Sequence, residues 1–129
     1  MASVFTKIIR GEIPCHKVAE NQDFIAFLDI SPNARGHTLC VPKAETDKIF
    51  EMDEAAYLNL MQFSYTVAKA LQKTVACERV GISVIGLEVP HVHVHLIPIN
   101  KMEDMAFTHK VEMGQSELAT LARAIAAKV

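Results

Sequence analysis

His91, His93 and His95 occupy alternate positions in the segment His-Val-His-Val-His-Leu-Ile. A β-strand turns successive side chains to opposite faces, so a strand over 91–97 would place these imidazoles on one face and the intervening apolar residues against a core. Imidazole titrates near neutral pH, at about 6.5 when unperturbed. A neutral ring can act as nucleophile or base, and a protonated ring as an acid or anion binder. The segment therefore predicts a reactive site.

Two other interpretations of the histidine segment stay open. A structural role is the less favoured one, because each buried imidazole needs hydrogen-bond partners. A histidine-ligated metal site is the stronger rival, since neutral imidazole is the commonest metal ligand. Alternate residues of a strand stand about 7 Å apart, whereas bonds from zinc to histidine are about 2 Å long. One ion would therefore engage two of these side chains more readily than three, and we expect neither a bound metal nor another cofactor.

Composition limits the classes of protein to which the chain can belong. Its 129 residues, 50% of them apolar, suit one domain over 1–129 with a single core. The net charge is −2 and no basic run occurs, so a long nucleic acid is not an expected partner. The N-terminus lacks a signal-peptide pattern and no apolar run approaches the ~20 residues of a membrane span. The cysteines, three in number, are scattered. These features predict a cytoplasmic protein without disulfides or membrane contact.

The elements that must position the histidines are predicted from periodicity and turn residues. We expect strands over 17–20, 24–30, 37–41, 79–85 and 91–97, and helices over 5–10, 54–76 and 116–128. Asp53 and Ser116 are the expected N-caps of the second and third helices. An apolar stripe along the second helix contains Leu58, Met61, Tyr65, Ala68 and Leu71, and it is widened by Tyr57, Leu60 and Val67. Its breadth suggests a subunit interface as well as a core. The pattern predicts an antiparallel meander together with helices, and residues 100–115 carry no clear signal.

The histidine segment resembles the pattern His-φ-His-φ-His-φ-φ, in which φ is apolar, of the histidine triad (HIT) family. Three further segments are similar to that family: 5–14 resembles its opening segment, 26–32 its ribose-and-base segment and 36–43 its next strand. The resemblance covers residues 1–100 in the family's order. Residues 101–129 then form a C-terminal extension that contains a helix.

The resemblance implies an α+β fold, a HIT-like antiparallel β-meander of about five strands with one long and one C-terminal helix, in a homodimer. It also implies a hydrolase or transferase, such as a phosphoramidase, that takes a purine nucleotide or nucleotide conjugate. Such an enzyme would cleave a nucleoside-monophosphate phosphoramidate or dinucleoside polyphosphate at the α-phosphate through a nucleotidyl-histidine. Cationic imidazoles and backbone N–H groups would stabilise the phosphoryl charge.

The resemblance also assigns roles to individual residues. His93 matches the nucleophile, His95 the adjacent phosphate contact, and His91 and His37 the supporting histidines. Asp29 matches the carboxylate that contacts ribose. The apolar slot around the base is matched by Phe5, Ile8, Ile13, Phe27, Ile30 and Leu39.

The stretch before the triad departs from the family pattern. Leu87 stands where Gln is common, and Glu88 where Ser or Thr usually contacts phosphate. Glu45 replaces a frequent His. A carboxylate at position 88 that faces the site would repel an anionic phosphate. A nucleotide-binding module with little catalysis is therefore an alternative to the enzyme.

Overall fold

Five strands form one antiparallel sheet in the computed structural model, which describes residues 2–129. The strand order is β1-β2-β3-β5-β4. The bounds are Lys17–Glu20 for β1, Phe24–Leu28 for β2, Thr38–Pro42 for β3, Arg79–Ser83 for β4 and Val94–Ile99 for β5. The predicted α+β fold with about five antiparallel strands is confirmed. The sheet differs from a simple meander because β5 lies between β3 and β4.

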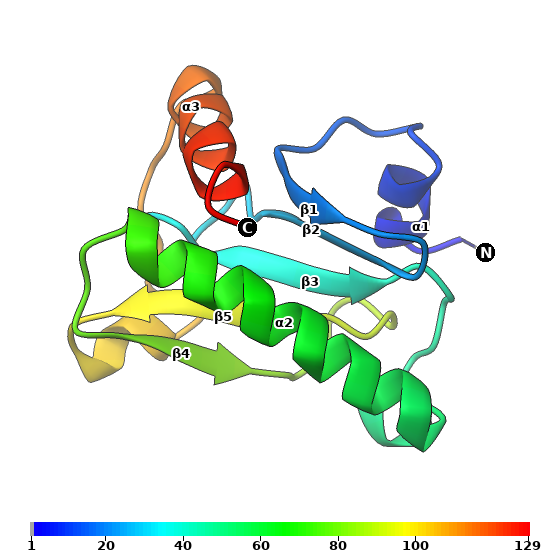
Figure 1. The fold of residues 1–129 in the computed structure, drawn as a ribbon. Helices are drawn as coiled ribbons and strands as arrows, with labels where there is room; N and C mark the ends of the chain where they lie inside the picture. Colours follow the sequence, from blue (N-terminus) through cyan, green and yellow to red (C-terminus); the bar gives the residue numbers. More distant parts are fainter. Residues whose placement is uncertain (1) are drawn as a thin grey trace.

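The helices lie on both faces of this sheet. Helix α1 spans Val4–Ile9, α2 spans Glu54–Thr74 and α3 spans Gln115–Ala126. Two short 3-10 helices that the sequence did not predict are η1, Ile49–Glu51, and η2, Met102–Met105. Figure 1 shows α2 laid across one face of the sheet. No helix of residues 2–129 is long and apolar enough to cross a membrane.

Alternation along the central strands separates two apolar clusters. Phe24, Ala26 and Leu28 of β2 join the larger cluster, which includes buried residues of α2 and α3. Ile25 and Phe27 point the other way and join a smaller cluster beneath α1. We call the side of the sheet that carries the larger cluster the helix face, and the side that carries the smaller cluster the site face. This is the period of two that a strand imposes on its side chains.

Several predicted boundaries differ from the structure. Strand β5 begins at Val94 and not at His91, because the backbone N–H groups of His91 and Val92 donate to Val89 and Thr46 in neighbouring loops. Strand β2 ends at Leu28, and the next residue turns the chain by accepting a side-chain hydrogen bond from the Ser31 N–H at 2.8 Å. The triad therefore straddles a strand start and is not carried on one straight strand.

The helix predictions were wrong at two points. Helix α3 begins after Gly114, whose N–H donates to the Glu117 carboxylate at 3.1 Å, so Ser116 lies within the first turn. The core side of α2 is formed by Leu60, Ser64, Val67, Ala70 and Leu71. Two members of the predicted stripe, Leu58 and Tyr65, are 57% and 66% exposed. Apolar residues surround so much of this helix that periodicity alone could not select the buried side.

Candidate active site

A cavity of about 460 Å³ opens on the site face. Phe5 of α1 and Leu39 of β3 contribute to the apolar part of the cavity wall, and both belong to the smaller cluster. His93 and His95 line the same space, together with Asp29 at the end of β2. The structure therefore brings a pair of imidazoles, a carboxylate and an aromatic ring around one volume. Pockets of this kind commonly bind small molecules.

His93 presents one unprotonated ring nitrogen. Its Nδ1 lies 2.7 Å from the carbonyl oxygen of His91, which can only accept, so Nδ1 carries the proton. In the neutral ring, Nε2 then holds the lone pair. Burial lowers the pKa of His93, so the ring is neutral at pH 7. The Phe5 ring packs edge-on against it, with centroids 4.9 Å apart. The arrangement suits a fixed nitrogen nucleophile or base.

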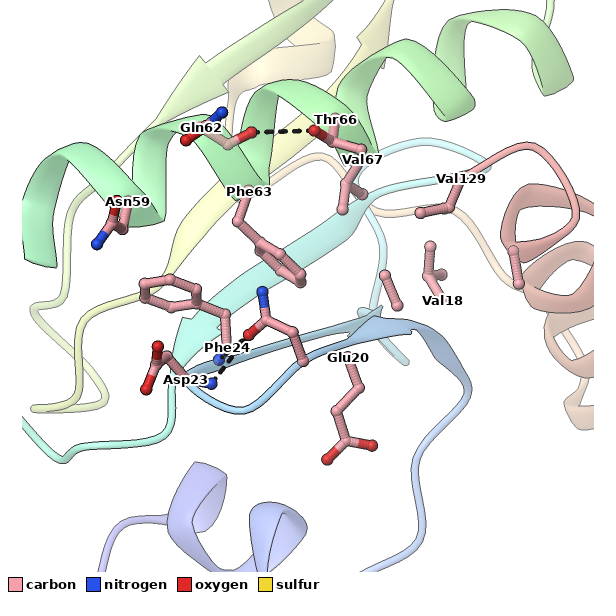
Figure 2. Close-up of a pocket in the computed structure, with 13 residues that line it drawn as sticks. Val18, Glu20, Asp23, Phe24, Asn59, Gln62, Phe63, Thr66, Val67 and Val129 are labelled. Carbon is pink, nitrogen blue, oxygen red and sulfur yellow. Dashed lines mark hydrogen bonds between the residues drawn. The ribbon is translucent and has the colours of Figure 1, made fainter.

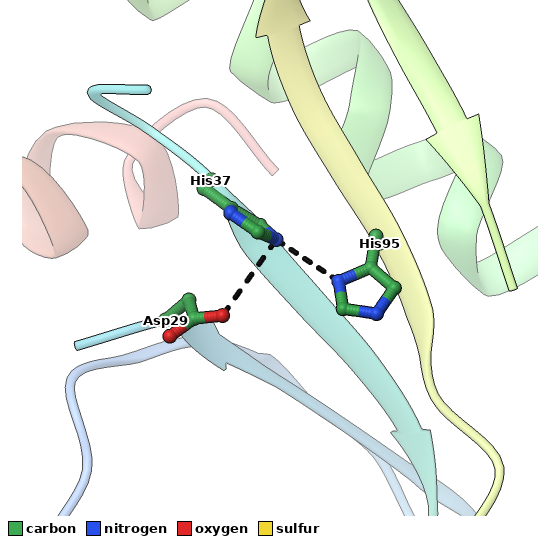
Figure 3. A group of neighbouring side chains, drawn as sticks. All are labelled: Asp29, His37 and His95. Atoms are coloured by element: carbon green, nitrogen blue, oxygen red, sulfur yellow. Dashed lines mark hydrogen bonds and ion pairs between the residues drawn. The ribbon is translucent and has the colours of Figure 1, made fainter. Parts of the chain in front are cut away.

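A chain of hydrogen bonds sets the tautomer of His95. The backbone N–H of Asn33 donates to Nδ1 of His37 at 3.0 Å, so the proton of a neutral His37 sits on Nε2. That Nε2–H donates to Nδ1 of His95 at 3.0 Å (Figure 3). A neutral His95 consequently carries its own proton on Nε2. The two cavity imidazoles thus differ: one offers a lone pair and the other an N–H donor.

Burial also keeps the two hydrogen-bonded imidazoles, His37 and His95, uncharged. It lowers the pKa of His37 to about 3 and that of His95 to about 4. The sequence-based expectation that cationic imidazoles stabilise the phosphoryl group therefore does not fit this site at neutral pH. His95 can donate a hydrogen bond to an anion, but it brings no net positive charge.

His91 is buried outside the cavity lining and joins separate parts of the fold. Its Nε2 donates to the carbonyl of Pro42 at 2.7 Å, and its Nδ1 lies 2.7 Å from Oγ of Ser3. Ser3 also caps α1 through the Thr6 N–H. Glu45 accepts hydrogen bonds from the backbone of Ser3 and the hydroxyl of Thr6. These contacts fix α1, and with it the Phe5 ring, against the nucleophile candidate.

Asp29 lies at the edge of the cavity. Its Oδ1 is occupied by the Ser31 N–H, and its Oδ2 lies 3.7 Å from Nε2 of His37. Burial raises the pKa of this carboxyl group. Oδ2 thus remains directed at the His37 ring and the adjoining space, and it is able to accept further hydrogen bonds.

The other predicted binding residues are dispersed. Phe27 packs behind Phe5, with ring centroids 5.8 Å apart, and Ile8 packs beside the same cluster. Ile13 is half-buried, and Ile30 is 68% exposed on a separate shallow depression. Neither of the last two lines the cavity, whereas Glu88 does. The structure therefore gathers only part of the predicted apolar slot.

Phe107 and Lys110 are among the cavity residues that the sequence did not predict. Both line the space but belong to the C-terminal extension. The Phe107 ring stands edge-on to His95, with centroids 4.7 Å apart. Residues 100–115 are mostly irregular, so no periodicity marks them.

One group in residues 2–129 could offer ligands to a metal ion. Ligand atoms of Asp29, His37 and His95 all lie within 4.8 Å of one another (Figure 3). An ion bound by His37 Nε2 would have to displace the proton that this nitrogen donates to His95. The metal alternative is thus confined to this group and does not involve the three triad histidines together.

A second cavity, of about 610 Å³, lies on the helix face between the β1–β2 turn, α2 and the end of α3 (Figure 2). Its polar lining includes the carboxylates of Glu20 and Asp23, the amides of Asn21, Asn59 and Gln62, and the hydroxyl of Thr66. Histidine and cysteine are missing from the described residues around it. It lacks a nucleophile or base suited to neutral pH, so the histidine cavity is the candidate active site.

Comparisons with known proteins show which family the chain resembles in sequence and fold. The family model described as HIT domain matches residues 10–102. An adenosine 5′-monophosphoramidase of Schizosaccharomyces pombe is 35% identical over 100 residues, which cover 76% of this chain and 74% of that protein. A HIT-like protein of Methanocaldococcus jannaschii is 39% identical over 106 residues, 74% of this chain and 77% of its own. The crystal structure of a HIT-like protein from Bartonella henselae has a TM-score of 0.85 and 29% identity, covering 98% of this chain and 96% of that one.

Proposed function

This chain belongs to the HIT family, and on that premise we propose that it is a nucleotidyl hydrolase or transferase acting on nucleoside-monophosphate phosphoramidates. The observation that carries the proposal is the neutral His93, whose Nδ1 proton is held by a backbone carbonyl and whose Nε2 is left with the lone pair. The name of the fission-yeast relative favours adenosine as the nucleoside. Dinucleoside polyphosphates are the second substrate class to test.

The proposed reaction has two displacements at the α-phosphorus. His93 Nε2 bonds to phosphorus as the bond to the leaving nitrogen breaks, and the amine leaves after taking a proton from water. The nucleotidyl-imidazolium that forms keeps its Nδ1–H on the His91 carbonyl, which stabilises the positive charge. Water then attacks phosphorus as the Nε2–P bond breaks, and one proton passes to solvent, where it balances the hydroxide left by the first step. The nucleoside monophosphate leaves and neutral His93 returns. The Nε2–H of His95 supplies a hydrogen bond to a phosphoryl oxygen.

Nucleotide binding is assigned to the groups around His93. Asp29 would accept hydrogen bonds from ribose hydroxyls, since an ionised carboxylate has several lone pairs. Phe5 and Leu39 would contact the base. His91 and His37 would act as positioning residues, because their hydrogen bonds place the cavity imidazoles.

A cytoplasmic homodimer without cofactors is the proposed form of the enzyme. Strand β4 pairs with β5 alone and leaves its other edge unpaired among the described strands. Ile82 on that strand and Leu58 and Tyr65 on α2 are exposed apolar side chains that a second copy would cover. Sedimentation equilibrium tests this assembly: a single species of monomer mass at micromolar concentration would contradict it.

The function itself is tested by trapping the covalent intermediate. Purified protein is mixed with adenosine 5′-phosphoramidate labelled with ³²P, quenched and separated from free nucleotide. Label should remain on wild type and on His16→Ala, a control that removes a histidine outside the cavity lining, but not on His93→Ala. Nucleotide binding without label or turnover would favour the binding module. Activity lost to a chelator and restored by zinc would favour the metalloprotein.

A further inference from the structure

The cavity contains an imbalance of charge. Asp29 and Glu88 bring negative charge to its lining, while Lys110 is the one lysine or arginine among the described lining residues. The imidazoles of His93 and His95 are neutral at pH 7, because burial lowers the pKa of each. An anionic phosphate entering this space would meet a single permanent positive charge.

Resting on the proposed function, we infer that Lys110 binds the phosphate of the nucleotide and is a specificity residue of this enzyme. Its ammonium nitrogen would bond a phosphoryl oxygen that His95 does not reach. The C-terminal extension, most of which lies beyond the matched HIT domain at 10–102, would thereby supply part of the substrate site. The substrate class this selects is a nucleotide with an anionic phosphoryl group, in preference to the nucleoside.

The ammonium group of Lys110 is already oriented. Nζ donates to Oδ1 of Asn33 at 2.9 Å and lies 5.4 Å from the centre of the Phe107 ring. Asn33 is completely buried, and its side-chain amide also donates to the carbonyl of Asp104 at 3.2 Å, so the acceptor is fixed. An ammonium group has three donors, of which this contact uses one. The ring face adds cation–π attraction and limits where the cation can go.

The segment that carries Lys110 is connected by hydrogen bonds to the loop residue that donates to His37. The Val111 N–H donates to the carbonyl of Pro32 at 2.9 Å, and Nδ1 of His109 lies 3.3 Å from the carbonyl of Asn33. The backbone N–H of that asparagine is the donor that sets the tautomer of His37. Lys110 and the His37–His95 pair are therefore positioned by one buried residue, which supports a joint role toward one ligand.

A purely structural role for Lys110, as an anchor of the extension, makes a different prediction. An anchor would affect every ligand of the cavity equally, whereas a phosphate contact would affect only ligands that carry phosphate. The test is a cycle that combines removal of the lysine charge with removal of the ligand phosphate. Adenosine 5′-monophosphate and adenosine are titrated calorimetrically into wild type, Lys110→Met and Lys110→Gln.

We expect both neutral variants to bind adenosine 5′-monophosphate about 5- to 30-fold more weakly, and adenosine within about 2-fold of wild type. Lys110→Arg should recover most of the lost affinity. Lys73→Met, which removes the same charge from the last turn of α2, should match wild type for both ligands. Melting temperatures of all variants show that each is folded under the titration conditions.

Two results would overturn the inference and leave the proposed function standing. They are equal weakening of both ligands, which indicates an anchor, and unchanged affinity for the monophosphate in both neutral variants. Wild type that binds neither ligand would contradict the proposed nucleotide site and the inference with it.

Discussion

The two faces of the sheet bury different kinds of residue. The helix face holds the larger cluster, in which buried apolar side chains of β1, β2, β3 and β5 pack against α2 and α3. The site face holds a cluster of Phe5, Ile25, Phe27, Leu39 and Val41, alongside buried imidazoles at positions 37, 91, 93 and 95. Burial on the first face stabilises the fold, whereas burial on the second holds ring nitrogens in chosen tautomers. Alternate residues of the same strands thus serve stability and chemistry separately.

The sharpest test of this division removes the nucleophile. His93→Ala should lower turnover by at least ~10³-fold, about 4 kcal/mol of barrier, while nucleotide affinity changes by less than about tenfold. Binding survives because base, ribose and phosphate contacts remain. The measurement is steady-state kinetics with a parallel binding titration. More than a tenth of wild-type activity in the variant would exclude His93 as the nucleophile.

The reciprocal test shortens a buried apolar side chain on the helix face. Leu60 is fully buried in the larger cluster, and Leu60→Ala should lower the free energy of unfolding by about 2–5 kcal/mol. Below the melting transition, kcat should stay within about twofold of wild type, since no cavity residue of the site face is touched. Denaturant titration and kinetics at 15 °C check both halves. A selective loss of kcat in a folded variant would show that the faces are coupled.

The contrast between the faces also explains what the sequence could predict. The strand at 17–20 was predicted with its observed bounds from periodicity and turn residues, whereas the α+β class was implied by the family resemblance. Alternation in the histidine segment indicated a reactive face, although β5 begins only at Val94. Periodicity alone could not reveal this start, because the backbone N–H groups of His91 and Val92 donate to loop carbonyls, one of them at the distant Thr46.

The parts of the site that escaped prediction depend on tertiary contacts. The tautomers of His37 and His95 follow from the backbone of Asn33, which no spacing rule connects to the triad. Lys110 reaches the cavity through an irregular segment, and its position depends on bonds to that same asparagine. Local pattern identified reactive residue types, but it could not assign protons or charges to them.

Acidification should affect the site face first. Burial lowers the pKa of His93 below its usual 6.5, so turnover should persist as the pH falls through 6.5 and decline only at lower pH. The folded pKa values of His37 and His95 are about 3 and about 4, below those of the unfolded chain. Their contribution to stability is therefore complete above about 6.5 and is lost as the pH falls toward 4 and 3, because the unfolded chain binds the protons.

Urea unfolding between pH 7.5 and 4.5 measures this loss. Wild type should lose stability steadily over that range, and His37→Gln, which removes one depressed imidazole, should show a shallower dependence. Parallel curves for the two proteins would contradict the assignment. The pH dependence of turnover is measured with a substrate for which chemistry is shown to be rate-limiting. An inflection of this profile above pH 6.5 would be inconsistent with a lowered pKa of His93.

The smallest expected effect concerns Glu88 on the cavity lining. Its carboxylate should repel dinucleoside polyphosphates more than singly charged phosphoramidates, in a solvent-accessible place where screening weakens the repulsion. Glu88→Ser should raise the ratio of kcat/KM values, polyphosphate over phosphoramidate, by about 2- to 5-fold at low salt. Reduced activity toward both substrates would instead assign Glu88 a positive role, such as orienting a leaving group.

The insertion of β5 between β3 and β4 has a consequence for the order of folding. Thr38 pairs with Leu96, so the β3–β5 ladder closes only after the intervening chain, including α2 and β4, has been made and brought back. Closing so long a loop carries an entropic cost that local hairpins such as β1–β2 avoid. We therefore expect the β1–β2 and β2–β3 hairpins to form early, and the His37–His95 contact to appear among the last events. Half-folded chains would then carry no aligned nucleophile, and reactivity would be confined to molecules that have completed the sheet.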